Sequence, residues 1–406
     1  MTKPDVAILG AGPAGLEAAL AAAEHGFPFT VYEAAADVAG HVRGWGHVRL
    51  FTPWSMTVSA RMRRALAAAG HEVPDGDACP TGAELLAKVY EPLGRLAVLD
   101  GRVRRGVRVL RVGRRGLLKH EEIGTGERAG HPFRLLVRDR DGRERIEEAG
   151  VVLDCTGNTE PNTVGDGGVP APGEESLGGA IVREMPDLAR DAADWAGRTV
   201  LLVGAGHSAQ TALIDLVELA AAHGGTRVVW ALRGDVPQAI ADDPLSERAR
   251  LTSRAARLAA DPPPCLEVRR GVVVDELAGS DGGVRVTLRG ADGGAETVDA
   301  DRVLALTGRV GDHLLYRQLQ VHECYATSGP MNLAAALLGQ GGGAGGDCLA
   351  QTSLGADTLK NPEPGFFILG AKSYGRRNDY LMRVGWQQVD EVFQLLRPSE
   401  RRSHTA

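Results

Sequence analysis

The sequence is poor in the features that mark several protein classes. Its 406 residues include only five cysteines, which are scattered and form no Cys-x-x-Cys pair. This odd, widely spaced set argues against a disulfide framework and against a zinc site, so we expect no bound metal. A glycine-rich segment separates Cys324 from Cys348, which leaves a functional pair between them open; buried or idle thiols are the alternative.

The chain also lacks a net positive charge and long apolar runs. The net charge of −6 gives no electrostatic attraction to nucleic acid or to an anionic membrane. No apolar run reaches the roughly 18 residues of a membrane span, and the N-terminus shows no signal-peptide pattern. We therefore expect a cytoplasmic protein that acts on a small molecule, with no nucleic-acid or membrane partner. The sequence leaves a homodimer open.

A glycine-rich motif, VAILGAGPAGLEAALAAAEHG, lies near the N-terminus. Asp5–Leu9 predicts a short buried strand, Leu16–His25 a helix, and Phe29–Glu33 a second strand that ends in an acid. This order of strand, glycine turn, helix and strand predicts a dinucleotide-binding unit. Because the chain is long for one hydrophobic core, we expect a second domain as well.

Each small residue of this turn has a physical role. Gly10 allows the tight turn, Gly12 lets the backbone approach a pyrophosphate, and Gly15 lets helix and strand pack closely. The helix N-terminus offers N–H groups and a positive dipole end to phosphate. Glu33 can accept hydrogen bonds from ribose hydroxyls and would repel a 2′-phosphate.

The same pattern returns in the middle of the chain. Arg198–Val203 predicts a strand, Gln210–Ala222 a helix and Arg227–Leu232 the next strand. The turn between the first strand and the helix is GAGHSA, Gly204–Ala209. A second dinucleotide site is therefore predicted.

The second copy differs from the first at the position that selects the cofactor. Its second strand ends in Arg233, and an arginine there can pair with a 2′-phosphate. This favours NADPH over NADH, with an exposed strand-end charge as the alternative. His207 lies inside the turn, where it is either a phosphate contact or an idle turn residue.

A further echo indicates an internal repeat. Ala149–Asn158 and Ala300–Arg309 each predict an apolar strand that ends in Thr-Gly, at Thr156-Gly157 and at Thr307-Gly308. A charged, β-rich stretch precedes each strand: Val107–Ile146 and Leu266–Val298. Two features matched in the same order favour a duplicated architecture.

This arrangement resembles the two-dinucleotide-binding flavoprotein superfamily, which includes thioredoxin-reductase-like enzymes and flavin-containing monooxygenases. The resemblance implies an α/β fold of two Rossmann-like, three-layer ββα domains, with the NAD(P)H domain inserted into the FAD domain. It implies FAD at the first turn and NADPH, or less favourably NADH, at the second. We expect the FAD domain over residues 1–180 and 311–406 and the NAD(P)H domain over residues 181–310.

The resemblance also extends to the C-terminal stretch PGFFILGAKSYG. Gly365–Leu369 predicts a strand, and Gly370-Ala371-Lys372 stands where such flavoproteins carry Gly-Asp, so the usual acidic contact must be made by backbone N–H groups or by Lys372. Val384–Gln388 opens a final helix near the flavin. The implied FAD contacts are Gly10, Gly12, Pro13, Ala14, Gly15, Glu33, Thr156, Gly157, Gly370, Trp386 and Gln387. The implied NADPH contacts are Gly204, Gly206, His207, Ser208, Ala209, Arg233, Thr307 and Gly308.

Two departures from the superfamily guide the choice of function. The chain has no redox Cys-x-x-Cys, and Gly178–Arg198 lacks the histidine of the usual flavin-monooxygenase signature. The GxGxSA turn nevertheless looks more like monooxygenases than like disulfide reductases. We expect a monooxygenase that forms a C4a-peroxyflavin with O2 and oxidises a small nitrogen- or sulfur-containing substrate. The alternatives are an NADPH-dependent reductase of a disulfide, quinone or carrier, and a non-catalytic FAD-binding sensor or transport-associated subunit.

Three polar or aromatic stretches are candidates for substrate chemistry: Gly40–Met56, Gln320–Leu338 and Lys372–Trp386. The first is expected to face the flavin, with a surface loop as the alternative. In the second, His322 and Glu323 invite comparison with a catalytic dyad, but neighbours on a strand point to opposite faces. The catalytic candidates are Trp45, His47, Arg49, Lys372, Tyr374 and Arg376.

Overall fold

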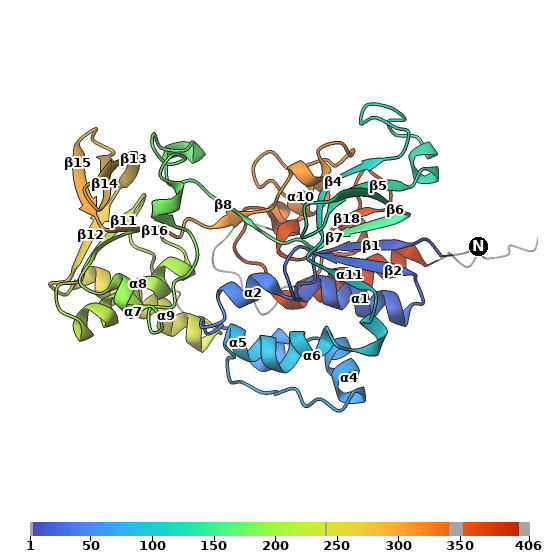
Figure 1. Ribbon diagram of the computed structural model, residues 1–406, viewed down its shortest axis with the longest axis horizontal. Helices are drawn as coiled ribbons and strands as arrows, with labels where there is room; N and C mark the ends of the chain where they lie inside the picture. Colours follow the sequence, from blue (N-terminus) through green and yellow to red (C-terminus); the bar gives the residue numbers. More distant parts are fainter. Residues whose placement is uncertain (1–2, 240–241, 341–351, 398–406) are drawn as a thin grey trace, which may run out of the picture. The chain divides into compact units, whose positions relative to one another are not determined.

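The computed structural model describes residues 3–239, 242–340 and 352–397. The chain forms two compact units (Figure 1): one comprises Met1–Gly46, Thr52–Thr159 and Val310–Ala406, and the other His47–Phe51 and Glu160–Arg309. The division lies at Thr159/Glu160 rather than at the predicted 180/181. It lies earlier because the segment after the first Thr-Gly already packs with the second unit.

The first unit is built on a parallel sheet. Its strand order is β18-β7-β1-β2-β3, with bounds Val6–Leu9 for β1, Phe29–Glu33 for β2, Val103–Arg105 for β3, Val151–Asp154 for β7 and Phe366–Ile368 for β18. An antiparallel meander covers one face: β4 (Arg108–Arg114), β5 (Phe133–Arg138) and β6 (Glu144–Ala149). Ala7 and Leu9 of β1 pack with Phe133 and Leu135 of β5, so alternate residues of the central strand fill the core between the two sheets.

Helices cover the other face of this sheet. Helix α1 (Pro13–Glu24) packs against β1 and against the final helix α11 (Met382–Leu396), as Figure 1 shows. A helical segment connects β2 to β3; it comprises α2 (Gly40–Gly44), α3 (Trp54–Thr57), α4 (Ala60–Ala68), α5 (Gly82–Leu85), the π turn η1 (Leu86–Tyr90), α6 (Glu91–Leu93) and η2 (Ala97–Leu99). Ser59 caps α4, and Thr81 with Glu84 forms a capping box at α5, which explains where these helices begin. Helix α10 (Met331–Gly339) belongs to the return segment.

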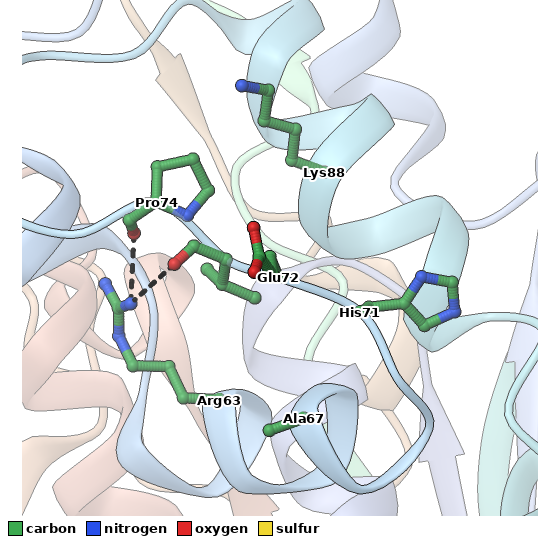
Figure 2. A pocket seen from close by; sticks show the side chains of 7 residues that line it. Arg63, Ala67, His71, Glu72, Pro74 and Lys88 are labelled. Atoms are coloured by element: carbon green, nitrogen blue, oxygen red, sulfur yellow. Dashed lines mark hydrogen bonds between the residues drawn. The ribbon is translucent and has the colours of Figure 1, made fainter.

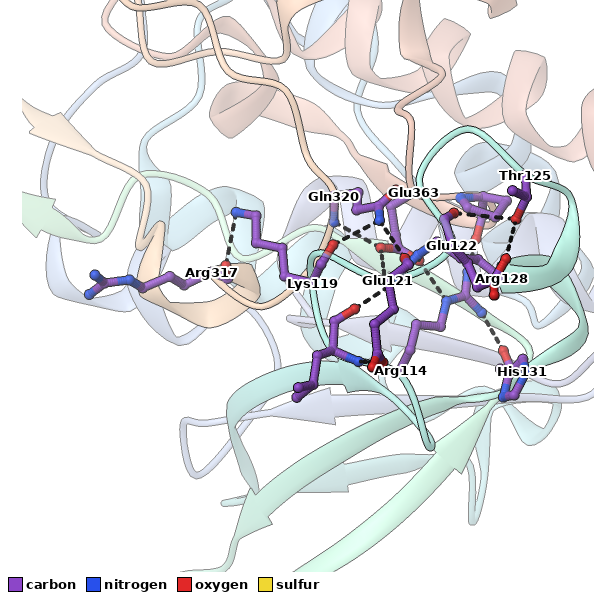
Figure 3. Close-up of polar contacts among 12 residues, drawn as sticks. Arg114, Lys119, Glu121, Glu122, Thr125, Arg128, His131, Arg317, Gln320 and Glu363 are labelled. Carbon is purple, nitrogen blue, oxygen red and sulfur yellow. Dashed lines mark hydrogen bonds and ion pairs between the residues drawn. The ribbon is translucent and has the colours of Figure 1, made fainter.

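A buried ion cluster fastens the long β4–β5 connection to the return segment. Arg114 and Arg128 converge on Glu363 (Figure 3), with 2.7 Å between each guanidinium and the carboxylate. All three side chains are essentially inaccessible to water. The backbone N–H of Gln320 donates a further bond to Glu363. The carboxylate is therefore fully compensated, and its pKa is lowered by these bonds although burial opposes its charge.

The second unit repeats the layers of the first. Its parallel sheet has the order β12-β11-β10-β16-β9, with β9 Ile181–Val182, β10 Thr199–Val203, β11 Arg227–Leu232, β12 Leu266–Arg270 and β16 Arg302–Ala305. One face packs on helices α8 (His207–Ala222) and α9 (Ser246–Ala260), with the short α7 (Ala192–Trp195) preceding β10. The other packs on the meander β13 (Val272–Ser280), β14 (Gly283–Gly290) and β15 (Ala295–Ala300). Leu266–Arg270, expected in this meander, joins the parallel sheet instead.

The internal repeat is visible in the strand order. Strands β18, β7, β1, β2 and β3 of the first unit correspond to β9, β16, β10, β11 and β12 of the second. Short strands β8 (Glu160–Pro161) and β17 (Arg309–Val310) pair where the chain passes between the units. The expected three-layer ββα architecture, with one unit inserted into the other, is confirmed. No helix in the described part of the chain has the length and apolar character needed to cross a lipid bilayer.

Candidate functional site

The first glycine turn is sterically required to be glycine at two positions. Gly10 has φ +93°, and a Cβ there would lie 2.8 Å from the carbonyl oxygen of Cys155. A Cβ on Gly15 would lie 1.9 Å from the carbonyl oxygen of Gly10. Both contacts are too short for a side chain, so strand β1, strand β7 and helix α1 approach one another closely here.

Beside this packed corner the turn is open. No heavy atom lies within 4 Å of the position that a Cβ on Gly12 would occupy. Gly12 is the N-cap of α1, no side chain caps the helix, and Pro13 begins it. The free helix N-terminus therefore presents backbone N–H groups and a positive dipole end to any anion at Gly12.

Glu33 is held at the same turn. Its carboxylate accepts hydrogen bonds from the backbone N–H groups of Ala11 and Ala35, each 2.7 Å long. These bonds fix an acid at the carboxyl end of β2 beside the glycine turn, where a ribose would need an acceptor. An adenine dinucleotide without a 2′-phosphate fits this arrangement.

A buried polar cluster lies at the carboxyl end of β7. The ammonium group of Lys372 donates to Asp154 Oδ2 (2.6 Å), Thr156 Oγ1 (3.2 Å) and the carbonyl oxygen of Asp312 (2.8 Å). Thr156 also donates to Asp154 through its hydroxyl, at 2.6 Å. Lys372 and Asp154 are buried completely. Because all three ammonium protons are used inside the unit, Lys372 is a structural ion-pair partner rather than the free cofactor or substrate contact that the sequence suggested.

The return segment closes against the first glycine turn. Gly370 has φ +73°, and a Cβ there would lie 3.0 Å from Cβ of Ala14. Its N–H donates to Gln388 Oε1 at 2.9 Å, and Gln388 in turn donates to Ser373 Oγ at 3.0 Å. The fully buried Gln388 thus fastens the turn η9 (Gly370–Tyr374) to α11.

The neighbours of Gln388 were the predicted contacts. Trp386 is buried, and Gln387 accepts a bond from the N–H of Ser353. The sequence therefore predicted a helix at this place, but it did not indicate that Gln388 holds Gly370. Gly157, the predicted contact next to Thr156, has φ +71°, and no heavy atom lies within 4 Å of the position of a Cβ there.

The second glycine turn repeats the geometry of the first. Gly204 has φ +132°, and a Cβ there would lie 2.3 Å from the carbonyl oxygen of Leu306. Gly206, the N-cap of α8, has no atom within 4 Å of a Cβ position. Ala209 is fully buried and Ser208 is exposed. The second unit thus has the same packed corner and the same open helix N-terminus.

Gln210 adds an unpaired acceptor to this second turn. Its side chain is buried and donates to the carbonyl oxygen of Ala205 at 3.0 Å. Its Oε1 atom has no hydrogen-bond partner among the described residues. A buried acceptor without a donor is costly, so a ligand N–H or a water in the site would stabilise it.

An aromatic and charged cluster surrounds His207. The Phe51 ring packs edge-on against His207, with 5.2 Å between ring centroids. Arg248 lies over Phe51 and forms a two-bonded ion pair with Asp243 at 2.7 and 2.8 Å. Burial and the nearby Arg248 lower the pKa of His207. A neutral imidazole at the helix N-terminus leaves the attraction of anions to the backbone N–H groups, because Arg248 is paired with Asp243.

The remaining predicted contacts of the second unit lie at the carboxyl edge of its sheet. Arg233 follows β11 directly and is exposed. Thr307 donates its hydroxyl to the carbonyl oxygen of Asn162 at 2.8 Å, and Asn162 Nδ2 donates back to the Thr307 carbonyl oxygen. Gly308 has φ +86°. The Thr307 side chain therefore binds the backbone just after β8, a role that the sequence did not predict.

The expected flavin-facing stretch Gly40–Met56 is divided between the units. His47 and Arg49 belong to the second unit, whereas Trp45 belongs to the first. The Trp45 ring packs where a Cβ on Gly82 would lie, 2.8 Å away. These three candidates therefore do not form one cluster within either unit.

The other candidates lie in the return segment. Tyr374 is buried and packs on Tyr380 with 5.4 Å between centroids, and burial raises its pKa to about 12. Arg376 is exposed, and the neighbouring Arg377 pairs with Asp379. The histidine that bonds Glu323 is His313. The adjacent His322, whose pairing with Glu323 the sequence disfavoured, is exposed.

The described cysteines form neither a disulfide nor part of a metal site. No disulfide joins the four cysteines that the structure describes, and Cys348, the suggested partner of Cys324, lies outside the described residues. Cys155 is buried beside Gly10, and burial raises its pKa. Within residues 3–239, 242–340 and 352–397, no three His, Cys, Asp or Glu side chains are arranged to hold a metal ion.

A cavity of about 540 Å³ lies in the helical segment of the first unit (Figure 2). It is lined by Arg63, Ala67, His71, Glu72, Val73, Pro74 and Lys88. Arg63 donates to the carbonyl oxygens of Val73 and Pro74, so its guanidinium is bonded to the loop that follows α4. None of the predicted cofactor contacts lines this cavity.

Comparison with known proteins agrees with this geometry. The model of the pyridine nucleotide-disulphide oxidoreductase family matches residues 4–325. A search of curated proteins found no match to the chain.

Solved structures with a similar fold include enzymes of two kinds. Bacillithiol disulfide reductase from Bacillus cereus is 21% identical, with a TM-score of 0.70 over 97% of this chain and 99% of that one. Thioredoxin reductase from T. acidophilum is 16% identical, with a TM-score of 0.59 over 97% and 99%. Ornithine hydroxylase from Pseudomonas aeruginosa is also 16% identical, with a TM-score of 0.62 over 98% and 99%. At these identities the likeness establishes the fold alone.

Proposed function

The chain belongs to the pyridine nucleotide-disulphide oxidoreductase family, whose cofactors are FAD and NAD(P)H, and we propose that within it the protein is an NADPH-dependent flavin monooxygenase. Its substrate in this proposal is a small nitrogen- or sulfur-containing compound, oxygenated with O2. The observation that carries the choice is the pair of open glycine turns, one per unit, together with the buried cysteine, Cys155, beside the first.

FAD is assigned to the first unit. In support, Gly12 leaves open space at the uncapped start of α1 and Glu33 is fixed beside it. Gly370 and Ala14 bring the return segment to the same turn. When bound, FAD supplies a ring that accepts a hydride from the nicotinamide and transfers electrons onward. The chain's own contribution would be to hold the dinucleotide, while Lys372 keeps the buried Asp154 compensated at the carboxyl end of β7.

NADPH is assigned to the second unit. Gly206 offers the matching open helix N-terminus, and Arg233 stands exposed at the carboxyl end of β11. A guanidinium at that position can pair with the 2′-phosphate that distinguishes NADPH from NADH. The unpaired Oε1 of Gln210 accepts a bond in the bound state, directly or through a water.

The choice of O2 over an internal dithiol relay rests on the cysteines. The thiol of Cys155, beside the first glycine turn, has a raised pKa and stays protonated. The sequence has no Cys-x-x-Cys. Electrons therefore pass directly to an external acceptor in this proposal, and the GxGxSA turn favours oxygen as that acceptor.

The test separates oxygenation from reduction. The purified holoenzyme is incubated with NADPH, ¹⁸O2 and a panel of small amines and sulfides, and products are analysed by mass spectrometry together with H2O2. One ¹⁸O atom per product, with NADPH consumed in near-equal amount, is expected for at least one compound. NADPH consumption that yields only H2O2 throughout the panel would overturn the monooxygenase.

A reductase of an external disulfide is the second candidate, and Cys324 favours it. Hydrogen bonds from the Thr327 hydroxyl and from the N–H groups of Thr327 and Ala326 lower the pKa of the Cys324 thiol. A thiolate is the form that attacks a disulfide, and the Cys324 side chain, only 3% exposed, would have to become accessible to do so. Anaerobic NADPH oxidation that depends on an added low-molecular-weight disulfide, and that is lost in Cys324→Ser but not in Cys265→Ser, would establish this function instead.

A further inference from the structure

A histidine, a glutamate and a tyrosine converge in the first unit. Nδ1 of His313 lies 2.5 Å from Glu323 Oε1, and the Tyr316 hydroxyl lies 2.6 Å from the same oxygen. The Tyr316 oxygen also lies 2.9 Å from His313 Nδ1. The cluster joins the turn η6 (Leu314–Tyr316) to the loop before α10.

The geometry dictates how the imidazole is protonated. The Glu323 carboxylate accepts the Tyr316 proton and the His313 Nδ1 proton, so Nδ1 is a donor. Nε2 then carries either a lone pair or the proton of the imidazolium. No hydrogen bond from Nε2 to a described residue accompanies this arrangement, and about a quarter of the His313 side chain is exposed (28%). A carboxylate that holds one ring nitrogen while the other stays accessible is the arrangement of a proton-transfer histidine.

The cluster lies at the ligand edge of the first sheet. Asp312, the residue before His313, accepts a bond from Lys372 through its carbonyl oxygen. Lys372 also bonds Asp154, the last residue of β7, and Thr156 just beyond it. A Cβ on Gly311 would lie 2.6 Å from the Lys372 side chain. Ligands of doubly wound sheets bind outside the carboxyl ends of the strands, so His313 stands beside the expected FAD site.

Two hydrogen bonds and a nearby lysine support an ionised Glu323. Burial opposes its charge, but hydrogen bonds from His313 and Tyr316 outweigh burial and lower its pKa, and Lys119 contributes in the same direction. The groups acting on Tyr316 are Glu323, Asp154 and Asp312, and together with burial they raise its pKa. Lys372 faces the ring of Tyr316 at 5.0 Å. Tyr316 therefore keeps its proton and positions the carboxylate.

We propose that His313 donates the proton that each turnover consumes, with Glu323 and Tyr316 as positioning residues. The inference rests on the proposed oxidoreductase function but on neither choice of acceptor. Oxidation of one NADPH by a disulfide takes up one proton and yields two thiols; oxygenation by O2 takes up one proton and yields the oxidised substrate and water. In either case the Nε2–H bond of the imidazolium breaks, an S–H or O–H bond forms on the product, and the imidazole regains a proton from solvent.

Two variants test the proposal by their turnover, with a neighbouring histidine as the control. His313→Gln is expected to lower kcat for steady-state NADPH oxidation by about 100-fold. This is the lower end of the range for the loss of a general acid. Anaerobic reduction of the bound flavin by NADPH, measured by stopped-flow absorbance, stays within twofold. Added imidazole restores part of the turnover. Tyr316→Phe, which keeps its packing on Phe366, lowers kcat less. His322→Gln, next to Glu323 but exposed, leaves both rates within twofold.

A spectroscopic readout is independent of turnover. Long-range ¹⁵N–¹H correlation spectra of the full protein at alkaline pH are expected to show His313 as the Nδ1–H tautomer. In Glu323→Gln that preference is expected to be lost, while the His322 signals stay unchanged.

The outcomes separate the inference from the function. Turnover of His313→Gln within threefold of wild type overturns the inference, as does an Nε2–H tautomer in the wild type. A loss of flavin reduction in parallel with turnover assigns His313 a structural role and also overturns it. Failure of NADPH to reduce the wild-type flavin overturns the proposed function, and the inference with it.

Discussion

Replacement of Lys372 by methionine should destabilise the first unit strongly. Methionine keeps most of the side-chain volume but removes the ammonium group. Asp154, which is fully buried, would then keep only the bonds from Thr156. Loss of one partner of a buried ion pair costs about 3–5 kcal/mol, because the remaining charge loses its counter-charge in the interior.

An exposed pair of the same residue types is the matched control. Lys360 and Asp357 lie 2.5 Å apart, but about half of the lysine side chain and most of the aspartate are in water. Lys360→Met should therefore cost at most about 1 kcal/mol. The comparison isolates burial, since both variants remove one ammonium group from a Lys–Asp contact in the same unit.

The assay is thermal unfolding of the holoprotein, followed by circular dichroism and by flavin release. At about 2–4 °C per kcal/mol for a unit of this size, Lys372→Met should melt roughly 6–20 °C below wild type. Adding Asp154→Asn should recover part of the loss, because the uncompensated charge is then removed. Equal melting temperatures of Lys372→Met and Lys360→Met would refute the assignment of a buried, compensated pair.

Three further predictions concern the cofactor sites and pH. Gly10→Ala places a Cβ against Cys155 at a positive φ and should abolish FAD retention, whereas Gly12→Ala, with open space around it, should keep the fold and lower FAD content; the ratio of flavin to protein absorbance decides. Arg233→Ser should raise KM for NADPH about tenfold with little change for NADH; an equal effect on both cofactors would remove the 2′-phosphate contact. Burial raises the pKa of Asp215 to about 6, above its ordinary value near 4, so the folded state binds the proton more tightly. The resulting destabilisation is absent below about pH 4 and complete above about pH 6, and Asp215→Asn should stabilise the protein at pH 8 by up to roughly 3 kcal/mol but not at pH 4; identical shifts in unfolding free energy at both pH values would contradict this.

The strand–turn–helix units could be predicted because their signals are local. Apolar runs indicate β1 and β10, and the spacing of the glycines indicates the two turns. The next strand then ends in Glu33 in the first unit and is followed by Arg233 in the second. The observed bounds agree with the predictions closely, with Phe29–Glu33 and Arg227–Leu232 matched at both ends. Helices α1 and α8 begin earlier than predicted because the turn residues Pro13 and His207 already have helical backbone.

The side-chain partners could not be predicted because they are far apart in the sequence. Lys372 appeared available for a cofactor or a substrate, yet its ammonium is consumed by Asp154, 218 positions away. No partner was predicted for Glu323, but a turn brings His313, ten positions earlier, to it. The stretch Gly40–Met56 appeared to be one loop, whereas its middle five residues pack with the second unit.

The sequence by itself determined the layered architecture, its duplication and the place of each dinucleotide turn. These features could be predicted because strand periodicity and glycine spacing depend only on residues close together in the sequence. Each glycine turn also requires the positive φ that Gly10 and Gly204 adopt. Only the tertiary structure decided which polar groups are consumed by packing and which stay available. A buried charge must find a partner wherever the fold supplies one, and that requirement pairs Lys372 with Asp154 in the core. His313, by contrast, keeps about a quarter of its side chain exposed.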